Sequence, residues 1–113
     1  MNKKYIEKYQ NIIDDQGFLL DPEYWSANFA IDSAKEFNLI LTDKHWEIIN
    51  IIRDLYEEKM IVPELRTTLK VLKNFNEEIA TRKYIYMLFP YGYGQQACLI
   101  AGMRQPKKLW LDL

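Results

Sequence analysis

The sequence predicts a mainly helical α+β protein: an N-terminal β-hairpin, then five or six helices with a helix-turn-helix-like centre, and a C-terminal arm. Three observations predict it. Apolar residues recur at helical spacing through the middle of the chain, capping residues and prolines mark helix ends, and the first 20 residues combine β-branched and aromatic side chains with a polar turn. A length of 113 residues suffices for one core. We therefore expect one domain over residues 1–113, divided into a hairpin or arm (1–20), a helical body (21–102) and an arm (103–113).

The N-terminal segment gives the β part of this prediction. Tyrosines and isoleucines at positions 5–13 favour extended strands, and the polar run at 14–17 (DDQG) is typical of a turn. Asp21 then places a capping side chain before Pro22, which suits a first helical position. A short helix should start there and carry Trp25 inward.

The middle of the chain predicts two further helices. A helix over 27–37 should end at Asn38, because asparagine tolerates the left-handed conformation that stops a helix. The clearest helix follows Thr42, a good N-cap, and carries an apolar stripe from Ile48 to Tyr56.

A second long helix should follow after a short apolar turn. Pro63 at a first helical position opens a helix over 64–75, with Phe75 among its inward residues. Two helices joined by so short a turn resemble a helix-turn-helix pair.

The C-terminal third predicts shorter elements. The helix over 81–88 ends before Pro90, and a loop over 91–94 follows. Residues 95–101 form a short helix with Gly102 as its C-cap, and the remainder lacks any periodic pattern. The inward positions of these segments predict a core of Trp25, Phe29, Trp46, Ile49, Ile52, Leu65, Leu69, Leu72, Tyr84, Leu88 and Ile100.

Composition excludes several classes of protein. The formal net charge of −1 argues against a globally basic nucleic-acid binder. A single cysteine allows neither an intrachain disulfide framework nor a multi-cysteine zinc site, and nothing indicates a cofactor. The N-terminus lacks the apolar core of a signal peptide and no stretch is long and apolar enough to span a membrane, so we expect a cytoplasmic protein.

Cys98 is the only soft nucleophile, and two interpretations stay open for it. Free cysteine is among the most buried residue types, which favours a small core hydrophobe. The alternative is a thiol that holds a persulfide. It would lie near the start of its helix and close to Arg104, Lys107 and Lys108, and both features stabilise a thiolate.

The remaining polar candidates are weaker. His45 is the only histidine and is expected to hold a helix start structurally. The adjacent carboxylate pairs at 14–15, 57–58 and 77–78 are expected to be solvent-exposed charges rather than acid/base catalysts. Arg66, Lys70 and Lys73 share one face of the helix over 64–75 and could bind an anion, although an ordinary solvated face is favoured and nucleic-acid binding should be weak.

Several blocks of the sequence together resemble the DsrC/TusE family of sulfur-relay proteins. Residues 83–92 (KYIYMLFPYG) and 96–103 (QACLIAGM) resemble its C-terminal signature. The blocks at 17–19 (GFL), 41–56 (LTDKHWEIINIIRDLY) and 63–66 (PELR) continue the match in one register. The resemblance implies a small, mainly helical domain whose C-terminal arm docks into a partner from a sulfur-relay or sulfite-reductase pathway.

The resemblance also implies a site, and this chain departs from it. Family arms carry a penultimate cysteine that holds the persulfide, and some members have a second cysteine eleven positions earlier, which Cys98 matches. Eleven positions after Cys98 stands Leu109, followed by Trp110 and three more residues. A carbon side chain cannot carry a sulfane sulfur, because the thiolate is the nucleophile.

Three hypotheses follow. The first is a divergent sulfur-relay component acting in sulfite reduction, sulfur oxidation or tRNA 2-thiolation, with Cys98 as its only sulfur site. The second is a non-catalytic regulatory paralogue, and the third is a nucleic-acid-binding regulator. In the first two, the docking arm comprises Arg104, Pro106, Lys107, Lys108, Leu109 and Trp110, and its apolar end should bury itself against its own domain or a partner.

Overall fold

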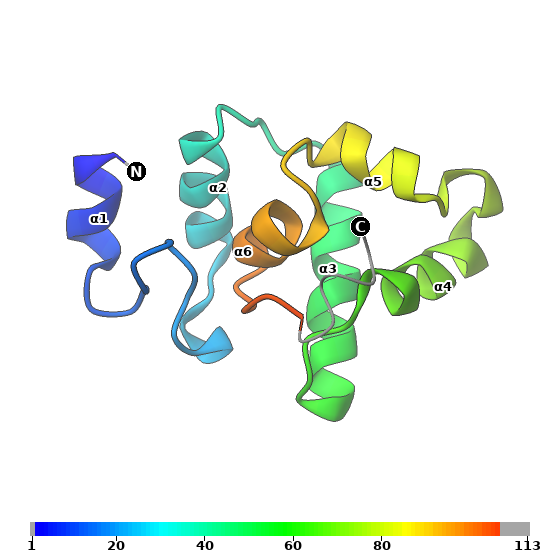
Figure 1. Ribbon diagram of the computed structural model, residues 1–113, viewed down its shortest axis with the longest axis horizontal. Coiled ribbons are helices and arrows are strands. Elements are labelled where there is room, and N and C mark those ends of the chain that lie inside the picture. Colours follow the sequence, from blue (N-terminus) through cyan, green and yellow to red (C-terminus); the bar gives the residue numbers. More distant parts are fainter. Residues whose placement is uncertain (1, 107–113) are drawn as a thin grey trace.

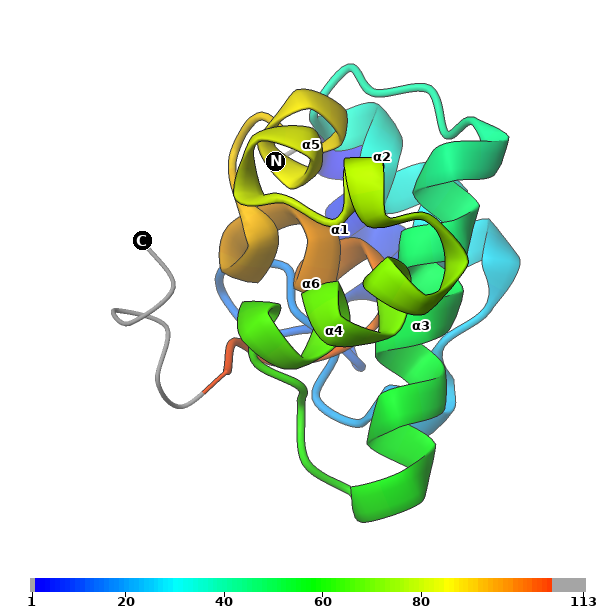
Figure 2. The ribbon, with the colours of Figure 1, turned by 90° about the vertical axis from the view of Figure 1, so that its right-hand side faces the viewer.

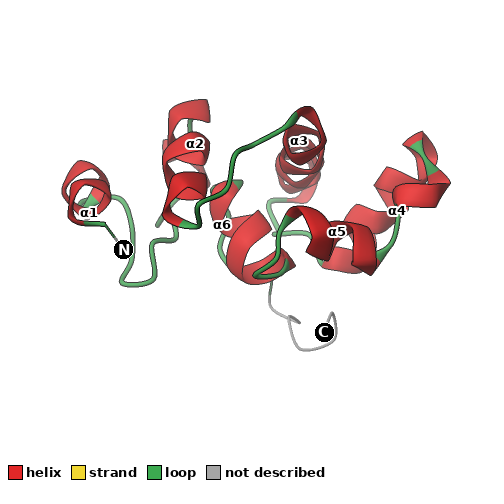
Figure 3. Ribbon diagram, turned by 90° about the horizontal axis from the view of Figure 1, so that it is seen from above, coloured by secondary structure: helices red, strands yellow, loops and turns green. Residues whose placement is uncertain are grey.

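Helices make up all the regular structure of residues 2–106, the part of the chain that the computed structural model describes. Figure 3 shows only helices and connecting loops in this part. The elements, in chain order, are α1 (Lys3–Tyr9), the 3₁₀ turn η1 (Pro22–Tyr24), α2 (Ala27–Glu36), α3 (Asp43–Lys59), α4 (Leu65–Phe75), the 3₁₀ turn η2 (Glu77–Ile79), α5 (Arg82–Leu88), the π-turn η3 (Tyr93–Ala97) and α6 (Cys98–Ile100).

The short helix α6 lies at the centre of this arrangement, between α2 and α3 (Figure 1), and it packs against both. On one side α2 separates α6 from α1. On the other side α4 packs against α3, as the predicted helix pair requires. Figure 2 views the molecule from the side that α4 and α5 form. The last secondary-structure element of the described chain is therefore enclosed by elements that precede it.

The predicted N-terminal hairpin is wrong, because residues 3–9 form α1. Asn2 caps this helix by accepting a hydrogen bond from the backbone N–H of Lys4 at 2.7 Å. Tyr5 and Tyr9 stand four residues apart, so a helix places both rings on one face, where they pack against Phe29 with centroid distances of 6.1 and 5.1 Å. Tertiary burial of this face overrides the strand preference of the aromatic residues.

The turn predicted at 14–17 is confirmed, although strands do not flank it. Asp14 accepts hydrogen bonds from the backbone N–H groups of Gln16 and Phe18 at 2.9 and 3.0 Å. Gly17 has a positive φ of 90°. The extended pairing in residues 2–106 is limited to one isolated bridge between Ile13 and Leu19.

Two predicted element boundaries are also corrected. Glu64 is the N-cap of α4 and Leu65 its first residue, so Pro63 lies outside the helix rather than at its first position. The segment predicted as a loop at 91–94 already contains the start of the π-turn, at Tyr93. The helix predicted to carry Trp25 is only the single 3₁₀ turn before it.

The core follows most of the predicted positions. Phe29, Ile49, Ile52, Leu65, Leu72, Leu88 and Ile100 are buried, whereas Trp25, Trp46, Leu69 and Tyr84 are partly buried and pack against the cluster from outside. Phe75 was expected to face inward and is 69% exposed, at the last residue of α4. Among the described residues no helix has the length and apolar character needed to cross a membrane.

Asp32 ties α1 to α2. Its Oδ2 accepts a hydrogen bond from the Tyr9 hydroxyl at 2.6 Å and forms an ion pair with Lys8 at 2.8 Å. Burial alone would raise the pKa of Asp32, but the hydrogen bonds from Lys8 and Tyr9 outweigh it and hold the pKa below its ordinary value of 3.8. Because the folded pKa is depressed, the stabilisation is present above that ordinary value and is lost as the pH falls through the folded value.

We therefore predict that Asp32→Asn lowers the thermal unfolding midpoint by about 2–5 °C at pH 7 and by less near pH 3. Melting curves at both pH values measure the difference. Asp15→Asn, at an exposed turn position, is the control and should change little at either pH. An Asp32→Asn deficit that is the same at both pH values would contradict the assigned ion pair.

Candidate functional site

Cys98 begins α6 directly after the π-turn over Tyr93–Ala97. Gly92 enters this turn with a φ of 96°, and the backbone N–H of Cys98 bonds to the carbonyl of Tyr93. Gln96, itself 1% exposed, accepts a hydrogen bond from the backbone N–H of Tyr91 at 2.9 Å. π-turns are uncommon and are enriched at functional sites, so the local backbone around Cys98 is a built feature.

The C-terminal end of α6 is a Schellman motif. The backbone N–H of Met103 bonds to the Cys98 carbonyl at 2.8 Å, and that of Gly102 bonds to the Leu99 carbonyl at 3.0 Å. Gly102 has a φ of 79°, the left-handed conformation that this motif requires, as the predicted C-cap role implied. The side chain of Met103 is fully buried, so the motif folds the chain back into the core.

The two remaining carbonyls at this helix end are bonded by side chains from distant parts of the chain. Trp25 donates its indole N–H to the Ile100 carbonyl at 2.9 Å, and Arg53 donates to the Ala101 carbonyl at 2.7 Å. Arg53 also bonds to the Pro22 carbonyl at 3.2 Å and stacks on the Trp25 ring, with its guanidinium carbon 4.2 Å from the centroid. All four terminal carbonyls of this buried helix are thus satisfied.

Trp25 and Arg53 together form what we call the anchor of α6, and this anchor also buries charge. Desolvation lowers the pKa of Arg53 below its ordinary value, against the opposing effect of Glu57. Arginine has so high an ordinary pKa that it keeps its proton, and its planar fork reaches two carbonyls while stacking on an indole.

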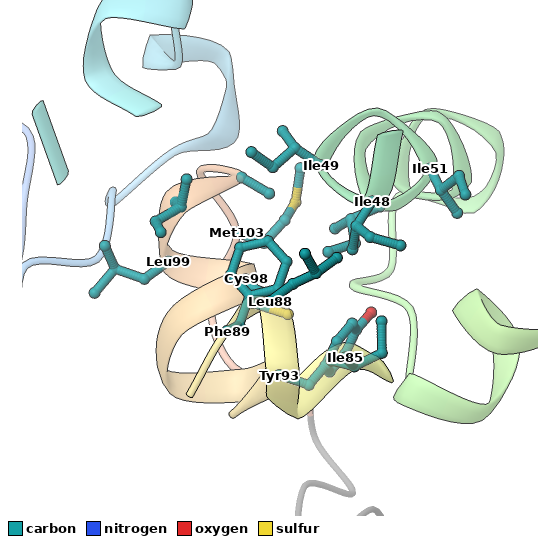
Figure 4. Packing of buried hydrophobic residues seen from close by; sticks show 14 of the residues in the cluster. Ile48, Ile49, Ile51, Ile85, Leu88, Phe89, Tyr93, Cys98, Leu99 and Met103 are labelled. Atoms are coloured by element: carbon teal, nitrogen blue, oxygen red, sulfur yellow. The ribbon is translucent and has the colours of Figure 1, made fainter. Parts of the chain in front are cut away.

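The side chain of Cys98 is fully buried, which supports the core interpretation of this residue. Figure 4 shows it among the apolar side chains of the main cluster, which include Leu88, Phe89 and Met103. A cysteine buried in apolar surroundings is a poor nucleophile, because reaction needs the thiolate and an access path. The structure therefore gives Cys98 no exposed reaction surface.

Of the cations expected near Cys98, Arg104 is exposed and pairs with Asp14 at 3.5 Å. The helix α6 is too short for a strong dipole. Pro106 is buried, as the last described residue of the predicted arm. Lys107, Lys108, Leu109 and Trp110 lie outside the described residues.

His45 holds a structural position, as predicted. Its Nδ1 accepts a hydrogen bond from the backbone N–H of Thr42 at 3.1 Å and closes a capping box at the start of α3. Its Nε2 lies 2.8 Å from the carbonyl of Leu88, which can only accept, so Nε2 carries the proton. Both ring nitrogens are occupied. Within residues 2–106, no cluster of His, Cys, Asp or Glu side chains could hold a metal ion.

The predicted anion-binding face is brought together with a residue that the sequence interpretation missed. Arg66, Lys70 and Lys73 are exposed on α4, and with Arg82 of α5 they line a shallow groove of about 260 Å³. Leu69 and Ala80 are its apolar lining residues. Arg82 follows Thr81, a helix N-cap visible in the sequence, but only the turn over 76–80 brings it beside α4.

Comparison with known proteins gives consistent matches. The family model described as "DsrC like protein" matches residues 5–109. The sulfurtransferase TusE of Escherichia coli (strain K12) is 36% identical over 96 residues, which cover 84% of this chain and 88% of that protein. TusE of Photorhabdus laumondii is 38% identical over 96 residues, covering 84% of this chain and 86% of the relative.

Solved structures are similar over a comparable share of the chain. The NMR structure of Allochromatium vinosum DsrC has a TM-score of 0.76 and 41% identity, covering 84% of this chain and 86% of that chain. The oxidized gamma-subunit of the dissimilatory sulfite reductase (DsrC) from Archaeoglobus fulgidus has a TM-score of 0.74 and 35% identity, with coverages of 83% and 87%.

The end of α6 gives a testable prediction. A Cβ on Gly102 would lie 2.5 Å from Cδ1 of Trp25, whereas one on Gly92 would meet Tyr86 at an ordinary 3.4 Å. Both glycines have positive φ, but Gly92 also has a ψ of 169° and so lies in a region that glycine alone readily adopts. Gly92→Ala therefore reports backbone strain without a close side-chain contact. We expect Gly102→Ala to lose roughly 2 kcal/mol of unfolding free energy beyond the ~1–2 kcal/mol cost of a left-handed alanine. Urea denaturation measures the loss, and a loss of only about 1 kcal/mol would contradict the tight Trp25 contact.

Proposed function

Because this chain belongs to the DsrC/TusE family of sulfur-relay proteins, we propose that it docks onto a partner protein in sulfur trafficking while transferring sulfur poorly or not at all. The relatives are named sulfurtransferases and a gamma-subunit of dissimilatory sulfite reductase. Similar identity to both kinds of relative supports a role shared by the family, which is the presentation of a small helical domain to a larger protein.

The observation that carries the proposal is the complete burial of the only thiol in the chain. Loading would require the Cys98 thiolate to attack the outer sulfur of a donor persulfide, forming the Cys98 persulfide and releasing the donor thiolate. The added sulfur atom would have to fit into a packed apolar cluster, where extra volume is destabilising. Arm residue Leu109, which stands eleven positions after Cys98, offers no thiol.

The burial of Cys98 and the lack of a thiol at position 109 favour a regulatory protein that docks onto its partner without transferring sulfur. Such a protein occupies the partner's site for the family arm and withholds sulfur. Cys98 then persists as a packing residue. A divergent relay component differs from this only in whether Cys98 ever loads, so one loading experiment distinguishes the two.

We predict that native protein incubated with a small-molecule persulfide donor gains no sulfur atom by intact-mass spectrometry. Leu109→Cys, which restores a thiol at the family's arm position, should gain one sulfur atom in the same reaction and shows that the donor is competent. Cys98→Ser in the Leu109→Cys background should leave that gain unchanged. A stable adduct on the native chain that Cys98→Ser abolishes would show that Cys98 is a working sulfur site.

A further inference from the structure

We propose that the groove between α4 and the start of α5 binds a short acidic segment of a partner protein. Its lining consists of Arg66, Lys70, Lys73 and Arg82 around the apolar residues Leu69 and Ala80. Figure 2 views the molecule from this side. The inference rests on the proposed docking function and names a surface for it that is separate from Cys98.

Charge complementarity gives the groove its specificity. Arg66, Lys70 and Lys73 follow at four- and three-residue spacing along α4, so they form one row of cations. Arg82 joins this row from the first turn of α5. An anion bound in the groove would offset the mutual repulsion of the row.

The three cations on α4 are available to a partner. Arg66 pairs with Glu64 at 3.4 Å and Lys73 pairs with Glu77 at 3.6 Å, with more than 60% of each basic side chain exposed. Exposed pairs of this kind contribute little and exchange readily. Lys70 is exposed and has no ion pair within residues 2–106. Carboxylates from another protein can therefore replace Glu64 and Glu77 as partners of Arg66 and Lys73 without loss of a buried interaction.

The surroundings favour a short peptide over a nucleic acid. Glu64 lies at the start of α4, and Glu77 and Glu78 follow its end, so carboxylates flank the basic row on both sides. A phosphate backbone carries closely spaced charges along its whole length and would meet these carboxylates. A segment with a few carboxylates around one apolar side chain instead matches four cations around Leu69 and Ala80.

Fluorescence anisotropy with a labelled probe peptide tests this directly. The probe is Gly-Ser-Glu-Glu-Leu-Glu-Glu-Ser-Gly, and the comparison peptide has glutamine in place of every glutamate. We expect the probe to bind with a dissociation constant of about 10–100 μM at low salt and to weaken as salt is added, as exposed charge contacts do. The glutamine peptide should bind at least roughly tenfold more weakly.

Lys70→Glu should weaken probe binding about tenfold, since it reverses a charge in the middle of the row. Lys4→Glu makes the same charge change on exposed α1, across the molecule, and should change binding less than about twofold. Circular dichroism melts establish that both variants are folded.

Three outcomes would overturn the inference: no binding of the acidic probe, equal binding of the glutamine peptide, or equal weakening by the two variants. Tighter, Lys70-dependent binding of a 12-nucleotide single-stranded RNA would assign the groove to nucleic acid instead. Sulfur loading involves none of the groove residues, so a failure of this inference and a failure of the proposed function are distinguishable.

Discussion

The described chain after α5, residues 89–106, depends on how the protein satisfies the C-terminal carbonyls of a helix buried in its centre. α6 brings four terminal carbonyls into an apolar interior, where an unpaired one would be strongly destabilising. Two are bonded within the Schellman motif, and Trp25 and Arg53 bond the others while stacking on each other. This contact joins η1, α3 and α6.

The anchor explains why the fold of a sulfur-relay protein persists here without an exposed thiol. Cys98 supplies a backbone carbonyl to the Schellman motif and a small apolar side chain to the core, and both roles are independent of sulfur chemistry. Cys98 is not part of the protein surface, whereas the basic groove on α4 and α5 is. Family membership and the burial of Cys98 are the observations that support the proposed docking role.

Local signals predicted most of the helices, and tertiary contacts decided the rest. Thr42 and Gly102 act as the caps that the sequence indicated, and His45 holds a helix start. The strand prediction at residues 5–13 failed because the tyrosine pair finds its partner, Phe29, only in the folded chain.

The candidate site shows the same division. Its residues could be selected by type, but neither the burial of Cys98 nor the approach of Arg82 to α4 is encoded by local spacing.

The reactivity of the Cys98 thiol tests the central claim, that this thiol is closed off in the folded protein, most directly. With Ellman's reagent, native protein should react at least about a thousandfold more slowly than protein unfolded in guanidinium, because reaction requires opening of the core. Arg53→Met, which removes the anchor of α6, should accelerate the native reaction. A native rate within about tenfold of the unfolded rate would contradict the account, because it would mean that the thiol is open to reaction in the folded protein.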